Sequence, residues 1–497
     1  MHSTLPHFFH LVKWEWRLAA AERSFGLTLA ILAVLTGLAF GVGLSWSGER
    51  RAVIDQFRAK EIENHKFLRS AFTDQTDLEQ IAGRSLNDHE KSHAKTVRVI
   101  AKLPTSLAYF GALWNALLPP APLAPLSIGH SDLWPDRLKI TARSKRTNFE
   151  REDIINPFQL ATGPFDLASL AVALFPLVLL VLNHDLISTD RERGVLALTL
   201  SQPTPYLQVV LARLLVRVGV PVSLVVGVSA LGLLAGGTNL LNPATAARFT
   251  VWAALVLVYG ALWGGLALTL NTLGGSSIAH AIALMACWIG MVIVVPAAIS
   301  KGAAFASPPP PRAELITFER EVNAEAEKKG RELLDQYYRD HPELERPNKQ
   351  ADPYGQMRWN VIGFEVDRQM RPVLQRHRDR ITDQVRFAGL WQSLSPALAV
   401  KAAMDDLAGT SLTHHLEFTA LAEQYHTEFM DYLRPKMMTR DDLILDDYDR
   451  LPSYSGLDLG QRLHPTQLGR SFLILGSWTA TLYVVGLVRL RSPITTS

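Results

Sequence analysis

The sequence predicts an α-helical integral membrane protein with six transmembrane helices and two large domains outside the membrane, mainly helical with some β structure. The main observation is that hydropathy is segregated along the chain. Apolar stretches of about twenty residues, enough to span a bilayer, alternate with blocks dense in charge, such as 49–102 and 312–387. A soluble helical protein would instead mix apolar and charged residues within each helix.

The charge and the cysteine content exclude several functions. A net charge of +3 over 497 residues is too small to indicate binding to nucleic acid. The single cysteine, Cys287, lies in an apolar run, so the chain can form neither an intrachain disulfide nor a cysteine-based zinc site. We therefore expect the charged domains to be held together by packing.

The N-terminal segment is expected to lie on the membrane surface. Residues 1–23 carry aromatic and aliphatic side chains at helical spacing with cations on another face, which favours an interfacial helix. An ordinary packed surface helix is the alternative. The first span, 24–46, exceeds the apolar core of a signal peptide and has no small-residue cleavage motif after it, so we expect it to remain as an anchor.

The other segments follow from the same hydropathy pattern. Five further spans are expected, at 165–187, 206–236, 249–272, 277–300 and 468–489. Residues 47–164 and 301–467 would form the two extracytoplasmic domains, and 188–205 a cytoplasmic coupling helix. Arg213 and Arg217 would then lie at the inner interface, where long side chains snorkel toward water.

Two details inside the expected spans bear on packing. Pro176 should kink the second span, because proline donates no backbone hydrogen bond. Gly260 and Gly264 form a small-residue patch that would allow close helix contact. The patch could equally be a passive result of the glycine enrichment of membrane helices.

The basic residues near the span ends set the orientation. Those that flank spans in short segments are Lys13, Arg17, Arg23, Arg191, Arg193, Arg489 and Arg491. With six spans all of them fall on one side, which the positive-inside rule assigns to the cytoplasm. The sequence therefore predicts a multi-pass protein of the bacterial inner membrane, with both termini in the cytoplasm.

The spans lack the features of an autonomous transporter. No ionisable residue is expected near the middle of a span, where a transporter driven by an ion gradient needs one. No G-x-x-x-x-G-K-[ST] loop occurs, so the chain does not hydrolyse nucleotide by that route. If the chain takes part in transport, its energy would come from another subunit.

The inner loop after the second span holds the most informative motif. Asp190, Arg191, Glu192 and Arg193 are followed by Gly194 and then by an apolar run that stops at Pro203. This order is typical of a small interfacial helix whose charged end is free to touch a cytoplasmic partner. The alternative is a loop that merely follows the positive-inside rule.

Several motifs, taken in order, resemble the permease subunits of ABC type-2 transporters, in the subgroup with two large extracytoplasmic insertions. The resemblance covers nearly the whole chain, and Val195 stands where the family usually has threonine. The matching pieces are Lys13-Trp14-Glu15, 125–129, 156–158, 163–167, 190–203, 271–277, Pro296, 394–397, 407–410 and 450–452.

The resemblance implies a specific set of partners. It implies a dimer of permease chains, identical or not, docked on two ATP-binding subunits that hold ATP and magnesium, with no cofactor in this chain. Lys13, Glu15 and the residues from Asp190 to Gly194 would contact those subunits. Lipid surrounds the spans, and the large outer domains suggest export toward a periplasmic partner. Catalysis within this chain is not expected.

Two rival functions stay open. His89, Glu90 and His93 match H-E-x-x-H, the pattern of a zinc peptidase in which the glutamate acts as base. Lys91 and the polar surroundings favour a solvated helix face instead, and His130 or Glu150 would have to supply a third ligand. The second rival is a structural or assembly protein whose outer domains bind partners.

Three further histidines invite a metal interpretation. His414, His415 and His426 lie in a segment with clear helical periodicity. Their spacing across turns of a water-facing helix favours surface histidines over metal ligands.

Overall fold

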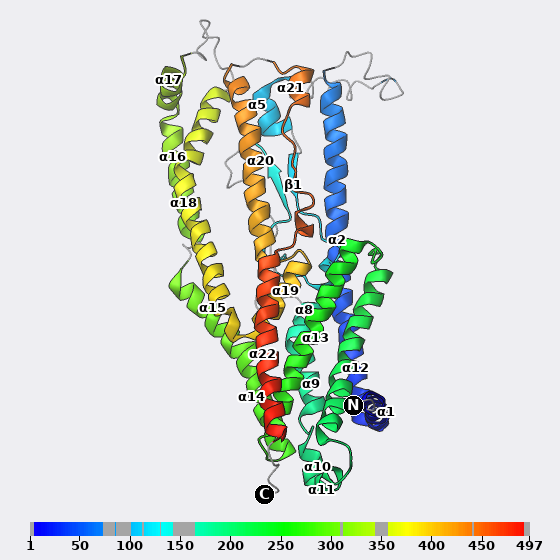
Figure 1. Cartoon of the computed structure of the whole chain (residues 1–497). Coiled ribbons are helices and arrows are strands. Elements are labelled where there is room, and N and C mark those ends of the chain that lie inside the picture. The colour runs from blue at the N-terminus through cyan, green and yellow to red at the C-terminus, as the bar shows by residue number, and fades with distance from the viewer. Residues whose placement is uncertain are drawn as a thin grey trace.

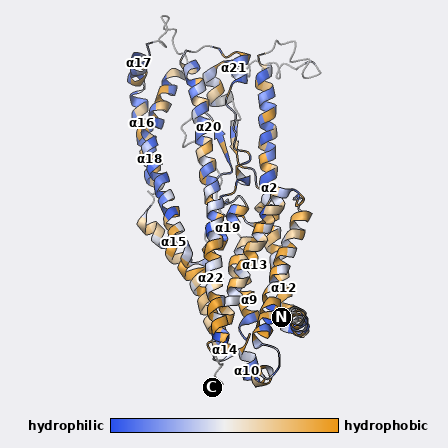
Figure 2. Cartoon of the chain, viewed as in Figure 1, coloured by the Kyte–Doolittle hydropathy of each residue, from blue (hydrophilic) through white to orange (hydrophobic). Residues whose placement is uncertain are grey.

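The computed structural model describes residues 4–72, 85, 101–111, 114–129, 131–142, 165–308, 312–342, 356–439 and 442–491. Within this part of the chain, six helical runs are long and apolar enough to cross a membrane. These runs are Arg23–Ser70, Leu167–Glu192, Tyr206–Ala235, Pro243–Asn271, Ser277–Ala306 and Leu459–Arg491. Apolar residues gather in one half of the molecule and hydrophilic residues in the other (Figure 2). The predicted class, a helical multi-pass membrane protein with a little β structure, is confirmed.

The first span belongs to a helix that continues into the hydrophilic half of the molecule. Following the predicted orientation, this half is called the outer half and the opposite end of the bundle the inner end. Helix α1 (Thr4–Ala21) lies across the foot of the bundle, and α2 (Arg23–Ser70) runs from there to the outer tip (Figure 1). At 1.5 Å per residue α2 is about 72 Å long, more than twice the apolar thickness of a bilayer. The boundary expected at 46–47 is therefore a change of hydropathy inside one helix, since no proline interrupts the backbone there.

The second span contains a π-helical turn before its proline. Its pieces are α8 (Leu167–Ser169), the π turn η3 (Leu170–Leu174) and α9 (Phe175–Asn183). The hydroxyl of Tyr259 donates to the carbonyl of Val172 at 3.0 Å, and the Trp288 indole donates to that of Ala173 at 2.9 Å. Neighbouring helices thus satisfy carbonyls that the irregular turn leaves free, as the membrane interior requires. The irregularity expected at Pro176 lies on its N-terminal side.

The third, fourth and sixth spans form the centre of the bundle. They are α12 (Tyr206–Ala235), α13 (Pro243–Asn271) and α22 (Pro465–Arg491). Helix α13 is the most buried, and its large side chains Trp252, Tyr259 and Trp263 are at most 1% exposed. The side chain of Asn242 caps α13 by accepting a hydrogen bond from the backbone of Ala244 at 2.9 Å.

The fifth span leans away from this centre and joins the outer domain. It comprises α14 (Ser277–Trp288), the π turn η4 (Ile289–Val294) and α15 (Val295–Ala306) (Figure 1). The Ser395 hydroxyl donates to the carbonyl of Met291 inside the π turn at 2.7 Å. Helix α15 packs against α18 (Gln356–Trp391), so this span is continuous with the outer structure.

The outer half consists of long helices around a two-stranded sheet. Its remaining helices are α5 (Pro104–Ser106), α16 (Arg312–Lys328), α17 (Gly330–Asp340), α19 (Pro396–Leu407), α20 (Leu412–Thr439) and α21 (Leu445–Asp449). Short π or 3₁₀ turns are η1 (Leu107–Gly111), η2 (Ala124–Leu126), η6 (Gln392–Leu394) and η7 (Leu459–Gln461). Strands β1 (Trp114–Leu117) and β2 (Arg137–Ile140) pair antiparallel, with Trp114 opposite Ile140. A core of buried apolar side chains joins α20 to this sheet.

The prediction of surface histidines on α20 is wrong. His414, His415 and His426 are 0%, 1% and 2% exposed. Polar partners compensate for their burial: Ser131 Oγ lies 3.1 Å from Nε2 of His415, and Nε2 of His426 lies 3.0 Å from the carbonyl of Thr141. Helical periodicity identified the helix, but histidines and aromatic residues share its buried face.

Candidate functional site

The inner end of the bundle is organised by Arg213 on α12. Its Nη1 donates to Oδ2 of Asp190 at 2.6 Å, and its Nε donates to Oε1 of Glu15 at 3.1 Å. The hydroxyl of Tyr206 also donates to Oδ2 of Asp190, at 3.2 Å. One guanidinium therefore ties α12 to α1 and to α10 (Ser188–Glu192), the first of two short helices in the inner loop.

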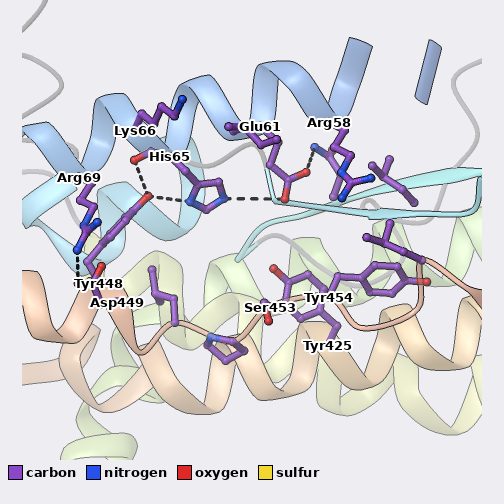
Figure 3. Close-up of a pocket in the computed structure, with 16 residues that line it drawn as sticks. Arg58, Glu61, His65, Lys66, Arg69, Tyr425, Tyr448, Asp449, Ser453 and Tyr454 are labelled. Carbon is purple, nitrogen blue, oxygen red and sulfur yellow. Dashed lines mark hydrogen bonds and ion pairs between the residues drawn. The ribbon is translucent and has the colours of Figure 1, made fainter. Parts of the chain in front are cut away.

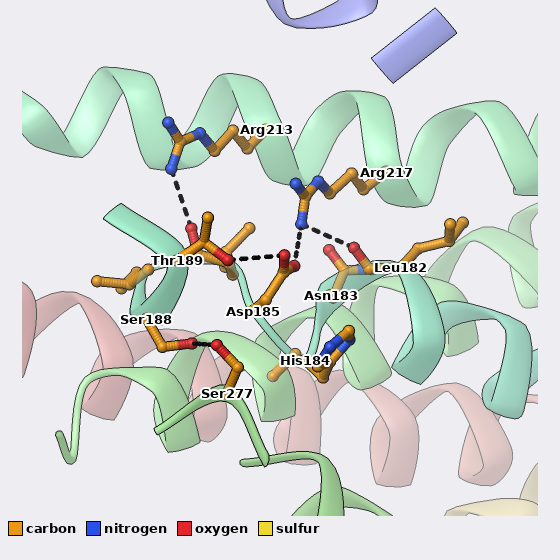
Figure 4. Close-up of polar contacts among 12 residues, drawn as sticks. Leu182, Asn183, His184, Asp185, Ser188, Thr189, Arg213, Arg217 and Ser277 are labelled. Atoms are coloured by element: carbon orange, nitrogen blue, oxygen red, sulfur yellow. Dashed lines mark hydrogen bonds and ion pairs between the residues drawn. The ribbon is translucent and has the colours of Figure 1, made fainter. Parts of the chain in front are cut away.

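Arg217, one turn further along α12, makes a second set of contacts. Its Nη1 donates to Oδ1 of Asp185 at 2.7 Å and to the carbonyl of Leu182 at 2.8 Å (Figure 4). The hydroxyl of Thr189 donates to the other oxygen of Asp185 at 2.8 Å. Both arginines thus pair with acids of the inner loop, whereas the sequence suggested that they snorkel to the membrane surface.

The inner loop is also tied to the turn before α14. Oε1 of Glu192 accepts the backbone N–H of Ser277 at 2.7 Å, and Oε2 accepts its hydroxyl at 2.8 Å. These contacts place a carboxylate at the N-terminus of α14, where the helix dipole favours negative charge. Deeper in the bundle, Asn271 accepts the backbone N–H of Ile187 at 3.1 Å and donates to the carbonyl of His184 at 3.1 Å.

Gly194 closes α10 and turns the chain into α11 (Leu196–Leu200). Its φ is +72°, in the left-handed region that glycine adopts without a Cβ penalty. The backbone N–H of Val195 donates to the carbonyl of Asp190 at 2.9 Å, the hydrogen bond expected of a Schellman motif. Beyond the turn, Val195, Leu198 and Leu200 are 42%, 65% and 45% exposed. These three residues, called here the apolar tip, belong to α11 or directly precede it, and α11 lies at the inner extremity of the molecule (Figure 1).

The structure divides the expected coupling residues into two groups. Asp190 is buried, and Glu15 is paired with Arg213, so both face into the protein instead of toward a partner. Lys13, Arg193 and Gly194 are exposed. Glu192 is exposed but bound to Ser277, and Arg191 donates to the carbonyl of Gly275 at 3.3 Å. Contact between these residues and an ATP-binding subunit stays a prediction.

The sequence analysis missed the acid–arginine pairing at this end. Two acids five residues apart, Asp185 and Asp190, face two arginines four residues apart on the next helix. An arginine inside a membrane helix is costly unless an acid neutralises it. Two arginines in a predicted span therefore indicate that acids lie at the same depth on a neighbouring helix. That signal could have identified the pairs.

The small-residue patch on α13 lies against α12. A Cβ atom on Gly260 would come 2.9 Å from Cγ2 of Val222, and one on Gly264 would come 2.9 Å from Cγ2 of Val218. A Cβ on Gly265 would meet the ring of Tyr483 on α22 at 2.9 Å. The glycines thus let α13 approach two neighbouring helices closely.

On the outer side, three motifs that lie far apart in the sequence converge. Asp166, at the start of α8, accepts the backbone N–H of Ile128 at 2.7 Å. Ser127 donates to Asp405 of α19 at 2.6 Å, and Lys401 donates to the same carboxylate at 2.5 Å. This buried network joins the second span to both outer segments.

A cavity of about 550 Å³ opens in the outer half between α2, β1, α20 and the chain after α21. Across it, Nδ1 of His65 lies 2.8 Å from the hydroxyl of Tyr448, and Asn115 donates to Glu61 at 3.2 Å (Figure 3). Tyr425 and Tyr454 form part of the opposite wall. Burial raises the pKa of the Glu61 carboxyl and lowers the pKa of His65. The volume is that of a small-molecule site.

Comparison with known proteins identifies one region of the chain. Residues 312–455 match a family model described as a domain of unknown function, DUF3526. No curated protein and no solved structure matches the chain. The DUF3526 region comprises α16 to α21, and therefore most of the second outer segment, and it contacts the last span through the packing of α19 on α22.

The zinc-peptidase motif falls in a part of the chain that the structure does not describe. His89, Glu90 and His93 lie outside the described residues, as do His130 and Glu150. The hypothesis of a zinc peptidase therefore stays a prediction from the sequence.

Proposed function

We propose that this chain is the transmembrane permease subunit of an ATP-driven ABC exporter in the bacterial inner membrane. ATP hydrolysis would take place in a separate subunit that holds ATP and magnesium. The observation that carries the proposal is the apolar tip, held at the inner extremity by the ion pairs of Arg213 and Arg217. Exposed apolar side chains gathered at one place are typical of a surface that contacts another protein.

The chemistry of the tip supports a protein partner. Val195, Leu198 and Leu200 are exposed, and the neighbouring Arg193 is exposed as well. Interfaces commonly combine an apolar centre with a polar or arginine-containing rim. On α1, Lys13 is exposed and the side chain of Trp14 is 63% exposed. These two residues would extend the same surface.

The contacts around the loop provide a route from the tip to the spans. Arg213 links α10 to α12 and α1, while Glu192 links α10 to α14. Force on α10 would therefore reach three helical elements at once. ATP-driven closure of the partner would shift the permease only if the partner binds its inward and outward states with different affinity.

The rest of the proposal concerns the assembly. Two permease chains, identical or related, would pair within the lipid bilayer, each on one ATP-binding subunit. The DUF3526 region lies in the outer half, at the end of the molecule opposite the apolar tip (Figure 1). Large outer domains favour export toward a periplasmic partner.

The decisive test is to purify the full chain from its native membrane and to measure the ATPase activity of the proteins that co-purify with it. Wild-type protein should bring with it an ATP-binding subunit that hydrolyses Mg-ATP in a vanadate-sensitive manner. Leu198→Glu places a charge on the apolar tip and should lower the co-purified activity about tenfold or more. Leu241→Glu is the matched control, because Leu241 is 91% exposed near the outer end of α13.

The outcomes separate the proposal from its rivals. Absence of ATPase from the wild-type preparation, or equal activity in Leu198→Glu, overturns the permease assignment. Peptide hydrolysis that disappears with His93→Ala would favour the zinc peptidase instead. A chain that assembles with outer partners but has no ATPase would favour the structural protein.

A further inference from the structure

Three side chains of metal-ligand type meet where the outer half joins the last span. Asp406 lies in the last turn of α19, His414 lies in the first turn of α20, and His464 directly precedes α22. Their ligand atoms all lie within 4.8 Å of one another, and the first two side chains are 0% exposed. We propose that Oδ1 of Asp406, Nδ1 of His414 and Nδ1 of His464 bind one divalent transition-metal ion.

The second nitrogen of each imidazole supports this assignment. Nε2 of His414 lies 2.8 Å from the carbonyl of Arg462, which can only accept, so this nitrogen carries the proton and Nδ1 keeps a lone pair. Nε2 of His464 lies 2.9 Å from Oε1 of Glu417. Metal-binding histidines are usually oriented in this way by a carbonyl or a carboxylate on the opposite nitrogen.

The carboxylate is oriented as well. Oδ2 of Asp406 accepts the backbone N–H of His464 at 3.2 Å, which leaves Oδ1 directed at both imidazoles. Oδ1 contacts Nδ1 of His464 directly and lies 3.7 Å from Nδ1 of His414. Zinc binds imidazole nitrogen at about 2.0–2.1 Å, so a tetrahedral centre needs ligand atoms about 3.3 Å apart. To reach that spacing, Oδ1 of Asp406 and Nδ1 of His414 would approach by a few tenths of an ångström, and Oδ1 and Nδ1 of His464, now in direct contact, would move apart.

Several other groups act on the cluster. The hydrogen bond to Asp406 raises the pKa of His464 to about 9, while burial lowers the pKa of His414. Ser411 Oγ lies 2.8 Å from Nδ1 of His414 and would rotate away. The other charged groups that act on the cluster are Glu417 and, from α13, Arg248.

The donor set indicates the class of ion. Two imidazole nitrogens and one carboxylate oxygen suit zinc and similar divalent ions of the first transition series, with water in the remaining position. The ion would join α19 and α20 of the DUF3526 region to the start of α22. Its occupancy would thus stiffen the connection between the outer domain and the last span.

The test measures zinc bound by the full chain in detergent, purified without a histidine tag, stripped with a chelator and dialysed against zinc. The background carries His89→Gln and His93→Gln, so that the separate H-E-x-x-H motif does not contribute. We expect about one zinc per chain, lost in His464→Gln and in Asp406→Asn. His426→Gln is the control, because His426 is a buried histidine on α20, the helix of His414, but lies outside the cluster.

A cysteine variant distinguishes a metal site from a proton bridge even if other variants unfold. His464→Cys removes the imidazolium but supplies a thiolate, so it should retain zinc and show a thiolate-to-cobalt charge-transfer band with Co²⁺. Absence of bound zinc in the His89→Gln, His93→Gln background, or equal binding when His464→Gln is added to it, overturns the proposal.

Discussion

Arg213 of α12 and Asp190 of the inner loop form an ion pair whose Nη1 and Oδ2 atoms lie 2.6 Å apart, with 17% and 12% of the two side chains exposed. The same guanidinium holds Glu15 of α1 at 3.1 Å. Two acids from separate elements therefore depend on one cation, and the apolar tip depends on both contacts for its position.

Loss of Arg213 should destabilise the inner end. Arg213→Gln leaves Asp190 and Glu15 without their cation, which should cost about 3 kcal/mol because both acids are largely desolvated. Arg213→Lys should recover only part of this, since an ammonium cannot match the forked geometry of a guanidinium. Thermal unfolding in detergent measures the difference, with the exposed Arg193→Gln as control. Equal unfolding midpoints for Arg213→Gln and Arg193→Gln would contradict the structural role of the pair.

Gly194 should be sensitive because of its backbone conformation alone. A Cβ atom would meet nothing within 4 Å there, yet φ is +72°. Gly194→Ala should therefore cost about 1–2 kcal/mol, whereas Gly194→Asn should cost less. Gly219→Ala is the matched control, because Gly219 also has open space around it but lies inside α12. If both alanine variants unfold at the same temperature, the left-handed turn is not needed.

Close packing of α13 on α12 gives a third prediction. Gly264→Ala should destabilise the bundle by about 1–3 kcal/mol, because its Cβ would lie 2.9 Å from Cγ2 of Val218. Val218→Ala should restore part of the loss in the double variant, which a double-mutant cycle of unfolding free energies measures. Gly290→Ala, with nothing within 4 Å, should have little effect. Additive effects of the two substitutions would show that the helices do not meet as described.

The cavity of the outer half makes stability depend on pH. Burial raises the pKa of Glu61, so the folded state holds this proton more tightly than the unfolded state. Stability from this group is therefore present at low pH and is lost as pH rises through the raised pKa. Glu61→Gln should unfold at a higher temperature than wild type at pH 7 and at nearly the same temperature at pH 4. Glu63→Gln, exposed on the same helix, should show no such trend; a parallel trend there would refute the explanation.

The single cysteine makes the orientation easy to test. In a Cys287→Ser background, cysteine at Glu314 or Asp446 should react with an impermeant maleimide in intact spheroplasts, because both residues are exposed on the outer half. Cysteine at Arg193 or Ser201, both exposed at the inner end, should react only after the membrane is opened. The reverse pattern would place the apolar tip outside and would remove the basis of the permease proposal.

Much of the membrane architecture could be predicted from the sequence. Spans expected at 206–236 and 277–300 correspond to helical runs Tyr206–Ala235 and Ser277–Ala306. This succeeds because lipid imposes a length and an apolar composition on every helix that crosses it, and both are local properties of the chain. A helix at the N-terminus was expected as well and is present as α1, while its position on the membrane surface stays a prediction.

The candidate sites were far less predictable. The sequence predicts Asp190 to be free to contact a partner. In the structure its side chain instead accepts a hydrogen bond from Arg213, twenty-three residues away, and is directed into the protein. His414 reads as a surface histidine, but it meets Asp406 and the carbonyl of Arg462 in the interior. In both cases the partner comes from another helix, and periodicity within one helix contains no information about it.

The sequence by itself determined that this chain is a helical multi-pass membrane protein and predicted which segments cross the membrane, because the transfer of each segment between water and lipid depends on its own composition. Only the tertiary structure decided which charged groups are paired, which glycines bring helices together, and that Asp406, His414 and His464 meet at the head of the last span. Those relationships depend on distances between elements far apart in the chain, and packing of the whole molecule sets those distances.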